Sequence, residues 1–355
     1  MTERNDEQFI IASNLVKIFR VAELEVVALQ GLDLEVQRGE VLALVGPSGS
    51  GKSTLMSALG GLDRPSAGRL EVDGQNLLKL SQAELTAYRR EQVGFVWQQT
   101  ARNLLPYLSA RENIELLMTL SGRTPRARRA WADELLEAVG MTDYANQKPT
   151  QLSGGQQQRI AIACALANQP KILLGDEPTG EVDWPTAQMI LALLRDLRTR
   201  YGLTIVVVTH DGRVAEQADR TVAIRDGRTS TETIRVVEQH AAAHDPAANG
   251  SARTTTLAPP AAEELVVLDS AGRLQIPADQ RLLAGIGRRA KVELVDGGIL
   301  IRPGDDDRNE AEEQPTEQDG AASIYRSLYH ADTPPPKPEP QAGKPRGWLR
   351  RSKTR

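Results

Sequence analysis

The segment Gly46-Pro47-Ser48-Gly49-Ser50-Gly51-Lys52-Ser53-Thr54 decides the fold of this chain. It follows an apolar run, precedes a helix-like run, and fits the pattern G-x-x-x-x-G-K-[ST]. The glycines let backbone N–H groups turn toward phosphate oxygens, and the following helix adds its positive N-terminal dipole. Lys52 is then placed to reach the β- and γ-phosphates, and the Ser53 hydroxyl to bind Mg²⁺. We therefore expect an α/β fold that binds a nucleoside triphosphate, rather than an ordinary Gly/Ser-rich turn.

Composition indicates a soluble globular protein with room for two domains, since the chain has 355 residues of which 40% are hydrophobic. The net charge of -4 gives no global reason to expect a nucleic-acid partner. Cys164 is the single cysteine, so no intramolecular disulfide can form. The start of the chain is polar and acidic, and no apolar run has the length of a membrane span. We expect a cytoplasmic protein whose membrane role needs a partner.

Three apolar runs that predict β-strands each end in polar side chains, which are Gln98, the pair Asp176 and Glu177, and His210. Such strand ends are where ligands bind in parallel α/β sheets. Asp176 can hold Mg²⁺ through a bound water, and Glu177 can polarise the water that attacks the γ-phosphate. His210 can contact the γ-phosphate. A lone Gln or His is more often structural, but their shared edge favours a site.

Ser153, Gly154 and Gly155 mark a second helix start, because an apolar-rich helical run follows them. Free N–H groups and the positive dipole suit this position to an anion. In isolation the same residues are only a turn with an N-cap. Two such helix starts in one nucleotide-binding chain require a joint explanation.

Phe19 is an aromatic residue in a polar-flanked segment upstream of the nucleotide loop. Most aromatic side chains belong to the core. A flat ring at this place can instead stack on adenine. The residues alone leave both interpretations open.

The sequence from about residue 8 to residue 232 resembles the nucleotide-binding subunit of ABC transporters. Residues 46–54 match its Walker A motif, residues 152–156 its LSGGQ signature and residues 172–177 its Walker B motif. These motifs in this order are far more specific than a P-loop alone. The resemblance implies a P-loop ATPase core with antiparallel β and helical subdomains. It also assigns the adenine-stacking aromatic Phe19, the Q-loop Gln98, the D-loop Asp183 and the switch histidine His210.

The resemblance implies an ATP and Mg²⁺ site shared between two copies. The chains would dimerise head to tail, with each ATP between Walker A of one copy and the signature of the other. This arrangement accounts for both anion-binding helix starts. The implied catalytic residues are Glu177, His210, Gln98 and Lys52. The implied Mg²⁺ ligands are Ser53, Gln98 and Asp176. The implied nucleotide contacts are Phe19, Gly46, Pro47, Ser48, Gly49, Ser50, Gly51, Lys52, Ser53, Thr54, Gln98, Leu152, Ser153, Gly154, Gly155, Gln156, Asp183 and His210.

Residues 59–63, 176–180 and 209–211 are similar to the MacB/LolD/FtsE branch of this family. Members of that branch pair with permeases that have few transmembrane helices and a large extracytoplasmic domain. The resemblance implies a homodimeric ATPase subunit on the inner face of the cell membrane. It would drive an integral permease of the MacB/LolC/FtsX type in export, lipoprotein or lipid extraction, or mechanotransmission. Three departures from the branch, Glu181-Val182 before Asp183, Gly175 and Cys164, remove no group that does chemistry.

The C-terminal third predicts three further segments. Residues 233–262 have the composition of a linker, and residues 304–355 that of a disordered tail that is acidic, then Pro-rich, then basic. Residues 263–303 are similar to AbrB-type swapped-hairpin domains, with a first strand expected at Leu265–Leu268. Basic and acidic residues are equal in number there, so we expect dimerisation and no DNA partner.

A rival class of function stays open, namely a soluble ABC-type ATPase or an ATP-dependent regulator that acts on DNA through the hairpin domain. DNA-acting relatives usually have long insertions between Walker A and the signature. The short interval between Ser53 and Ser153 leaves no room for them. The basic end of the tail is either a solubilising segment or a contact to anionic lipid. The transported substrate is not encoded in an ATPase subunit.

Overall fold

The computed structural model describes residues 8–21, 24–99, 103–119, 121–235, 262–269, 272–287, 290–295 and 298–303. The chain divides into two compact units, 1–278 and 279–355, and the nucleotide loop belongs to the first. The predicted tail 304–355 and residues 236–261 of the predicted linker lie outside the described residues.

A seven-stranded sheet forms the centre of the first unit, with the order β11-β10-β9-β3-β8-β7-β6. Strands β6, β7, β8, β3 and β9 run parallel to one another, whereas β10 and β11 are added antiparallel at one edge. The central strands are buried on both faces, which explains their continuous apolar runs. The bounds are β3 (Val41–Val45), β6 (Val93–Val96), β7 (Ile172–Asp176), β8 (Thr204–Val208), β9 (Arg220–Arg225), β10 (Arg228–Arg235) and β11 (Ala262–Val266).

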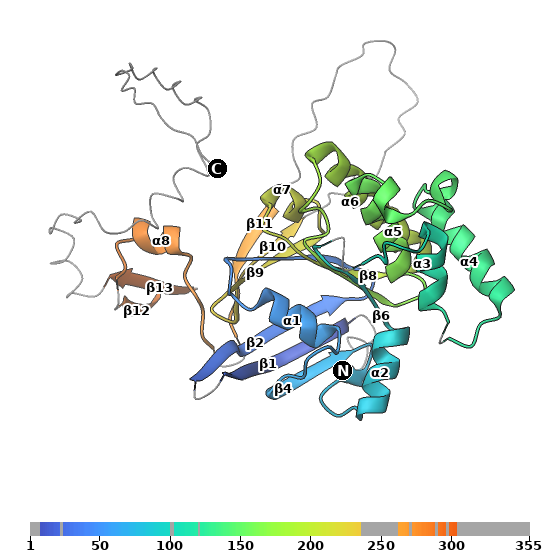
Figure 1. Cartoon of the computed structure of the whole chain (residues 1–355). Coiled ribbons are helices and arrows are strands. Elements are labelled where there is room, and N and C mark those ends of the chain that lie inside the picture. The colour runs from blue at the N-terminus through green and yellow to red at the C-terminus, as the bar shows by residue number, and fades with distance from the viewer. Residues whose placement is uncertain are drawn as a thin grey trace, which may run out of the picture. The chain divides into compact units, whose positions relative to one another are not determined.

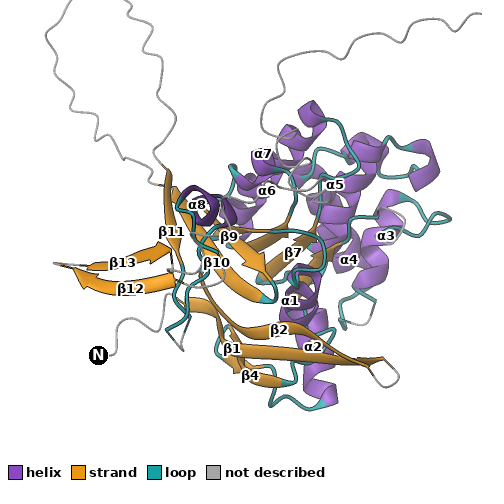
Figure 2. Ribbon diagram, turned by 90° about the vertical axis from the view of Figure 1, so that its left-hand side faces the viewer, coloured by secondary structure: helices purple, strands orange, loops and turns teal. Residues whose placement is uncertain are grey.

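A four-stranded antiparallel sheet with the order β2-β1-β4-β5 forms a second layer, coloured blue in Figure 1. Its strands are β1 (Gln8–Val21), β2 (Leu24–Gln37), β4 (Ala67–Val72) and β5 (Gln75–Asn76). Figure 2 shows helix α1 (Lys52–Leu59) above this layer. The α1 residues Leu55 and Leu59 are fully buried in one core cluster with Leu32 of β2 and Leu174 of β7. The nucleotide loop thus leads into a helix between the two sheets.

The helices pack a second apolar core on the side of the central sheet where Figure 1 draws α3 to α6. The helical subdomain that the resemblance implies is confirmed by α3 and α4, which lie between Ala110 and Ala138. Among the residues that the structure describes, no helix has both the length and the apolar character needed to cross a membrane. The helical bounds are α2 (Gln82–Glu91), α3 (Ala110–Leu117), α4 (Pro125–Ala138), η2 (Thr142–Tyr144), η3 (Pro149–Gln151), α5 (Gly154–Ala165), α6 (Trp184–Tyr201) and α7 (Gly212–Ala215).

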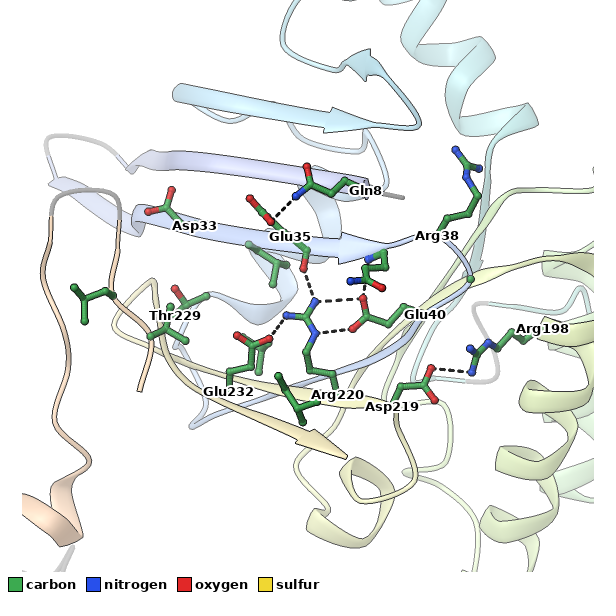
Figure 3. A pocket seen from close by; sticks show the side chains of 17 residues that line it. Gln8, Asp33, Glu35, Arg38, Glu40, Arg198, Asp219, Arg220, Thr229 and Glu232 are labelled. Carbon is green, nitrogen blue, oxygen red and sulfur yellow. Dashed lines mark hydrogen bonds and ion pairs between the residues drawn. The ribbon is translucent and has the colours of Figure 1, made fainter. Parts of the chain in front are cut away.

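Arg220, the first residue of β9, links the two sheets through its hydrogen bonds at the start of the parallel strands (Figure 3). Its Nε donates to Glu40 at 2.6 Å, its Nη1 to Glu232 of β10, and its Nη2 to the carbonyl of Glu35 in β2. The side chain is 16% exposed, so these partners are what make its burial tolerable. A cavity of about 670 Å³ lies around this cluster.

The C-terminal segment adds a strand to the central sheet. The strand expected at Leu265–Leu268 lies partly in β11 (Ala262–Val266), which pairs with β10. An open sheet edge has unpaired N–H and C=O groups, and β11 satisfies those of β10. In the described part of the second unit, the elements are α8 (Ala278–Leu283), which begins at the unit boundary, and the paired strands β12 (Ala290–Val295) and β13 (Gly298–Pro303). The expected α/β fold with antiparallel and helical subdomains is confirmed.

Candidate functional site

The nucleotide loop connects the end of β3 to the start of α1, as its sequence predicted. Gly46 has φ 144° and Gly51 has φ 105°, conformations that favour glycine. A Cβ on Gly46 would lie 2.1 Å from the carbonyl oxygen of Ile224, and one on Gly51 would lie 2.7 Å from that of Ala28. Both glycines are therefore required by close backbone contacts to β9 and β2. Pro47, Ser48 and Gly49 are exposed, Ser50 is buried, and Ser53 and Thr54 lie in the first turn of α1.

Lys52 folds back over its own loop. Its Nζ donates hydrogen bonds of 2.8 Å to the carbonyl oxygens of Gly46 and Pro47. The pKa of Lys52 lies below its ordinary value, because burial lowers it by more than the nearby carboxylates of Glu177 and Asp176 raise it. The ammonium group is thus held at the centre of the loop, where phosphate oxygens can replace the carbonyl acceptors.

The structure brings together three of the polar side chains at the strand ends. The Glu177 carboxylate accepts from Gln98 Nε2 at 2.8 Å through Oε2, and contacts His210 Nδ1 at 2.8 Å through Oε1. Glu177 has φ 48°, a left-handed conformation that is uncommon outside glycine, and its amide donates to the carbonyl of Val208. Asp176, the last residue of β7, is paired with Val208 of β8 and lies one residue away. The carboxylate of Glu177 is therefore held in place from both sides.

A cavity of about 210 Å³ adjoins this carboxylate. Its lining includes residues that the sequence did not point to as part of the site. The ring of Trp184 lies 4.3 Å from the guanidinium of Arg213, which in turn pairs with Asp211 at 2.7 Å. The hydrogen bond from Arg213 lowers the pKa of Asp211. Asp183 is the N-cap position of α6, directly before Trp184. Asp211 is the N-cap of α7, and Arg213 follows two residues later. This Asp-x-Arg spacing at a helix start is the sequence pattern that could have indicated the cluster.

The signature residues begin α5, as the sequence predicted. The Ser153 hydroxyl accepts from the Gln156 amide, and the Gln156 side chain accepts from the Ser153 amide at 2.8 Å, which is a capping box. Ser153 and Gly154 are exposed, and among the described residues no atom from outside the first turn of α5 and its adjoining residues lies within 4 Å of a Cβ built on Gly154. Leu152 is buried in the helical core, so the structure places it behind this surface. The exposed helix start has the space and the dipole that an anion requires.

Phe19 lies in β1 opposite Val26 of β2, and its side chain is 37% exposed. The ring is therefore partly exposed and is not a core residue. Lys17 Nζ lies over the ring, 4.8 Å from its centroid, and pairs with Asp63 at 2.6 Å. Stacking of Phe19 on adenine stays a prediction.

Comparisons with known proteins agree with this geometry. The family model for ABC transporters matches residues 29–180. The uncharacterized ABC transporter ATP-binding protein YvrO of Bacillus subtilis is 48% identical over 61% of this chain and 93% of its own length. The macrolide export ATP-binding/permease protein MacB of Bartonella quintana is 44% identical over 66% of this chain. That alignment spans only 35% of the MacB protein.

A solved structure supports the same assignment. The dimeric ATP-binding cassette MJ0796, in a post-hydrolysis state bound to ADP and Pi, is 41% identical to this chain. The likeness covers 63% of this chain and 97% of that chain, with a TM-score of 0.57. From the motifs, the joined Gln98, Glu177 and His210, and these likenesses, we conclude that the chain belongs to the ABC transporter ATP-binding proteins and is an ATP-binding ATP hydrolase.

Proposed function

We propose that this chain is the ATPase subunit of a membrane transport complex and acts as a head-to-tail homodimer. The observation that supports it most is the exposed start of α5, where Ser153 and Gly154 offer an anion site without a neighbour over Gly154. A second copy would bring its Walker A loop, with ATP, against this surface. The related cassette MJ0796 is itself dimeric in its post-hydrolysis state.

In this proposal Glu177 orients and polarises the water that attacks the γ-phosphate. Gln98 and His210 hold its carboxylate at 2.8 Å on either side, so its orientation is set before ATP arrives. His210 is 70% exposed and Glu177 only 19%, so the histidine is the partner that the γ-phosphate of ATP on the Walker A loop of the same copy would reach. Lys52 would exchange the carbonyls of its own loop for the β- and γ-phosphates.

We further propose that Mg²⁺ accompanies ATP. Ser53, Asp176 and Gln98 provide hydroxyl, carboxylate and amide oxygens, which are the ligand types that Mg²⁺ prefers. The strand-end carboxylate and the exposed Ser53 suit a cation that also contacts the phosphates. When bound, the ion would neutralise charge that develops on the phosphate oxygens.

We propose a separate integral membrane permease of the MacB/LolC/FtsX type as the partner, which would place the protein at the inner face of the cell membrane. The MacB relative is named as an ATP-binding/permease protein, and this chain aligns with 35% of it. Exposed apolar side chains occur near the Q-loop, between β6 and the end of α3. They are Tyr107 (66% exposed), Leu116 (42%) and Leu117 (45%). This surface is our candidate for the permease contact, through which ATP-driven motion would be transmitted.

We also propose that the β12–β13 hairpin dimerises with the same hairpin of a second copy. Val292 and Leu294 pair with Ile301 and Ile299, so the four apolar side chains share one face. Leu294 is 89% exposed, Val292 67% and Ile299 66%. A two-stranded hairpin alone is marginal in water, so this face favours burial against its own copy. Such a contact would raise the effective concentration of the two ATPase domains.

Replacing Glu177 by Gln should lower ATP turnover at least about 100-fold, because the amide cannot act as the base. ATP binding should be retained, since Gln keeps the shape and a hydrogen-bonding oxygen. Steady-state hydrolysis and equilibrium binding of a fluorescent ATP analogue measure the two properties. Glu137→Gln, an exposed change on α4, is the matched control. Normal turnover in Glu177→Gln would contradict the role of Glu177.

The packing of the signature residue Gly155 against α6 can be tested by substitution. A Cβ on Gly155 would lie 2.4 Å from Cγ2 of Thr186 in α6. Gly155→Ala should therefore shift α5 and reduce ATPase activity about tenfold. Adding Thr186→Ser removes the clashing methyl group and should restore most of the activity, while Thr186→Ser alone stays near the unmodified protein. If the double variant is as inactive as Gly155→Ala, the glycine is needed for another reason.

The permease proposal can be tested by affinity purification of the tagged full-length protein from detergent-solubilised membranes of its source cells. We expect an integral membrane protein in the eluate. Leu117→Asp should abolish its recovery and leave basal ATPase activity intact, because a charge at the apolar surface disfavours docking. Met189→Asp, at a similarly exposed position on α6, is the control. Equal recovery with Leu117→Asp would refute this contact surface, and DNA in place of a membrane protein would favour the rival function.

Self-association of the hairpin can be measured by analytical ultracentrifugation of the full-length protein without ATP. Leu294→Asp should raise the dimer dissociation constant at least about tenfold, because it buries a charge in an apolar interface. Glu293→Ala changes the opposite face of the same strand and should leave the constant unchanged. Unaltered dimerisation of Leu294→Asp would rule out this interface.

A further inference from the structure

We propose that residues 262–269 and 272–277 form a clasp that positions the nucleotide loop, and that Asp269 is its positioning residue. The clasp would make the affinity for ATP depend on the C-terminal segment. The inference concerns the ATP hydrolysis assigned above and does not require the proposed permease or hairpin dimer.

The clasp is continuous with the ATPase sheet. Strand β11 pairs antiparallel with β10 from Arg235 opposite Ala262 to Thr231 opposite Val266, and the amide of Val267 donates to the carbonyl of Ser230 at 3.0 Å. Residues Val267 and Leu268 also line the cavity of about 670 Å³ with Thr229 and Glu232 of β10, which Figure 3 labels. The clasp begins after residue 180, where the match to the family model ends. The alignments to YvrO and MacB cover 61% and 66% of this chain.

Asp269 lies three residues after the end of β11 and is hydrogen-bonded to Arg273. Its amide donates to the Arg273 carbonyl at 2.9 Å, and its carboxylate accepts from the amide and the Nε of Arg273 at 2.8 and 2.7 Å. The Asp269 carboxylate also lies 3.9 Å from Nη1 of Arg228, the first residue of β10. The Asp269 side chain is only 8% exposed. Removing its carboxylate would therefore take a buried negative charge away from both Arg228 and Arg273.

The residue before Arg228 contacts the nucleotide loop. The Gly227 amide donates to the carbonyl of Ser50 at 2.9 Å, and the Gly227 carbonyl accepts from the Gln30 amide at 2.9 Å. Arg273 reaches the same place from the clasp, since its Nη2 would lie 3.6 Å from a Cβ built on Gly31, the neighbour of Gln30. The clasp therefore borders both β2 and β10 where they hold the turn against Ser50.

This connection predicts a selective effect on ATP binding. Ser50 belongs to the loop that holds the phosphates, so loosening Gly227 should weaken the loop as a phosphate site. The catalytic side chains Gln98, Glu177 and His210 follow β6, β7 and β8, which are separated from β10 by β3 and β9 in the sheet order. We expect a higher KM for ATP with kcat retained.

The test is steady-state ATP hydrolysis by the full-length protein with MgATP as the titrant. In Asp269→Ala the KM for ATP should rise about fivefold while kcat stays within about twofold. Asp269→Glu, which keeps the charge, should recover part of the affinity. Asp143→Ala removes an exposed carboxylate in η2 and should change neither constant.

A second change keeps the proposal open to refutation if Asp269→Ala does not fold. Arg273→Gln should raise the KM in the same way, because it removes the guanidinium that pairs with the Asp269 carboxylate. Arg228→Gln should raise the KM for ATP by a smaller factor in the Asp269→Ala protein than in the unmodified protein, since both changes act through one contact. A KM within about twofold of the unmodified protein in both single variants would overturn the proposal. A fall in kcat at unchanged KM would overturn it as well.

Discussion

Close packing of backbone against backbone holds the nucleotide loop, and the site depends on it. A side chain on Gly46 would meet the carbonyl of Ile224, and one on Gly51 the carbonyl of Ala28. A Cβ on Gly227 would likewise lie 2.6 Å from the Ala28 carbonyl oxygen, and the Gly227 amide donates to Ser50. The direct supports of the loop are main-chain atoms of β9, β2 and the turn into β10, and side chains such as Asp269 reach it only through that turn. The loop N–H groups can therefore be arranged before a phosphate arrives.

The charged groups of the site already satisfy one another within one copy. Lys52 donates to carbonyls of its own loop, and Glu177 is held between Gln98 and His210. ATP therefore has to exchange existing hydrogen bonds for new ones, so only ligands with phosphate charge and geometry gain from binding. The start of α5 is different, because Ser153 and Gly154 are exposed there and the capping box involves only Ser153 and Gln156. The two halves of the proposed shared site thus differ in how far their polar groups are paired within one copy.

Local chemistry explains which features the sequence could predict. Glycine spacing and Lys52 indicated the loop, and an acidic pair after an apolar strand indicated the position of Glu177. Pairing between distant segments was not predictable in the same way. The run that became β11 has ordinary strand composition, and its pairing with β10 depends on which sheet edge is open, not on its own residues. The contact of Trp184 with Arg213 joins two helix starts that the sequence alone does not bring together. The exposure of Phe19 likewise depends on the register of β1 with β2.

Arg220 gives the two sheets of the first unit an asymmetric attachment. Its guanidinium joins Glu35, Glu40 and Glu232 at the first residue of β9, whereas the parallel strand β3 leads into the nucleotide loop at its opposite end. Because the guanidinium is largely buried, replacing Arg220 would leave the carboxylates of Glu40 and Glu232 next to each other without their shared counter-charge. The join between the two sheets therefore rests on one residue at the end of the parallel strands that is remote from the phosphate loop.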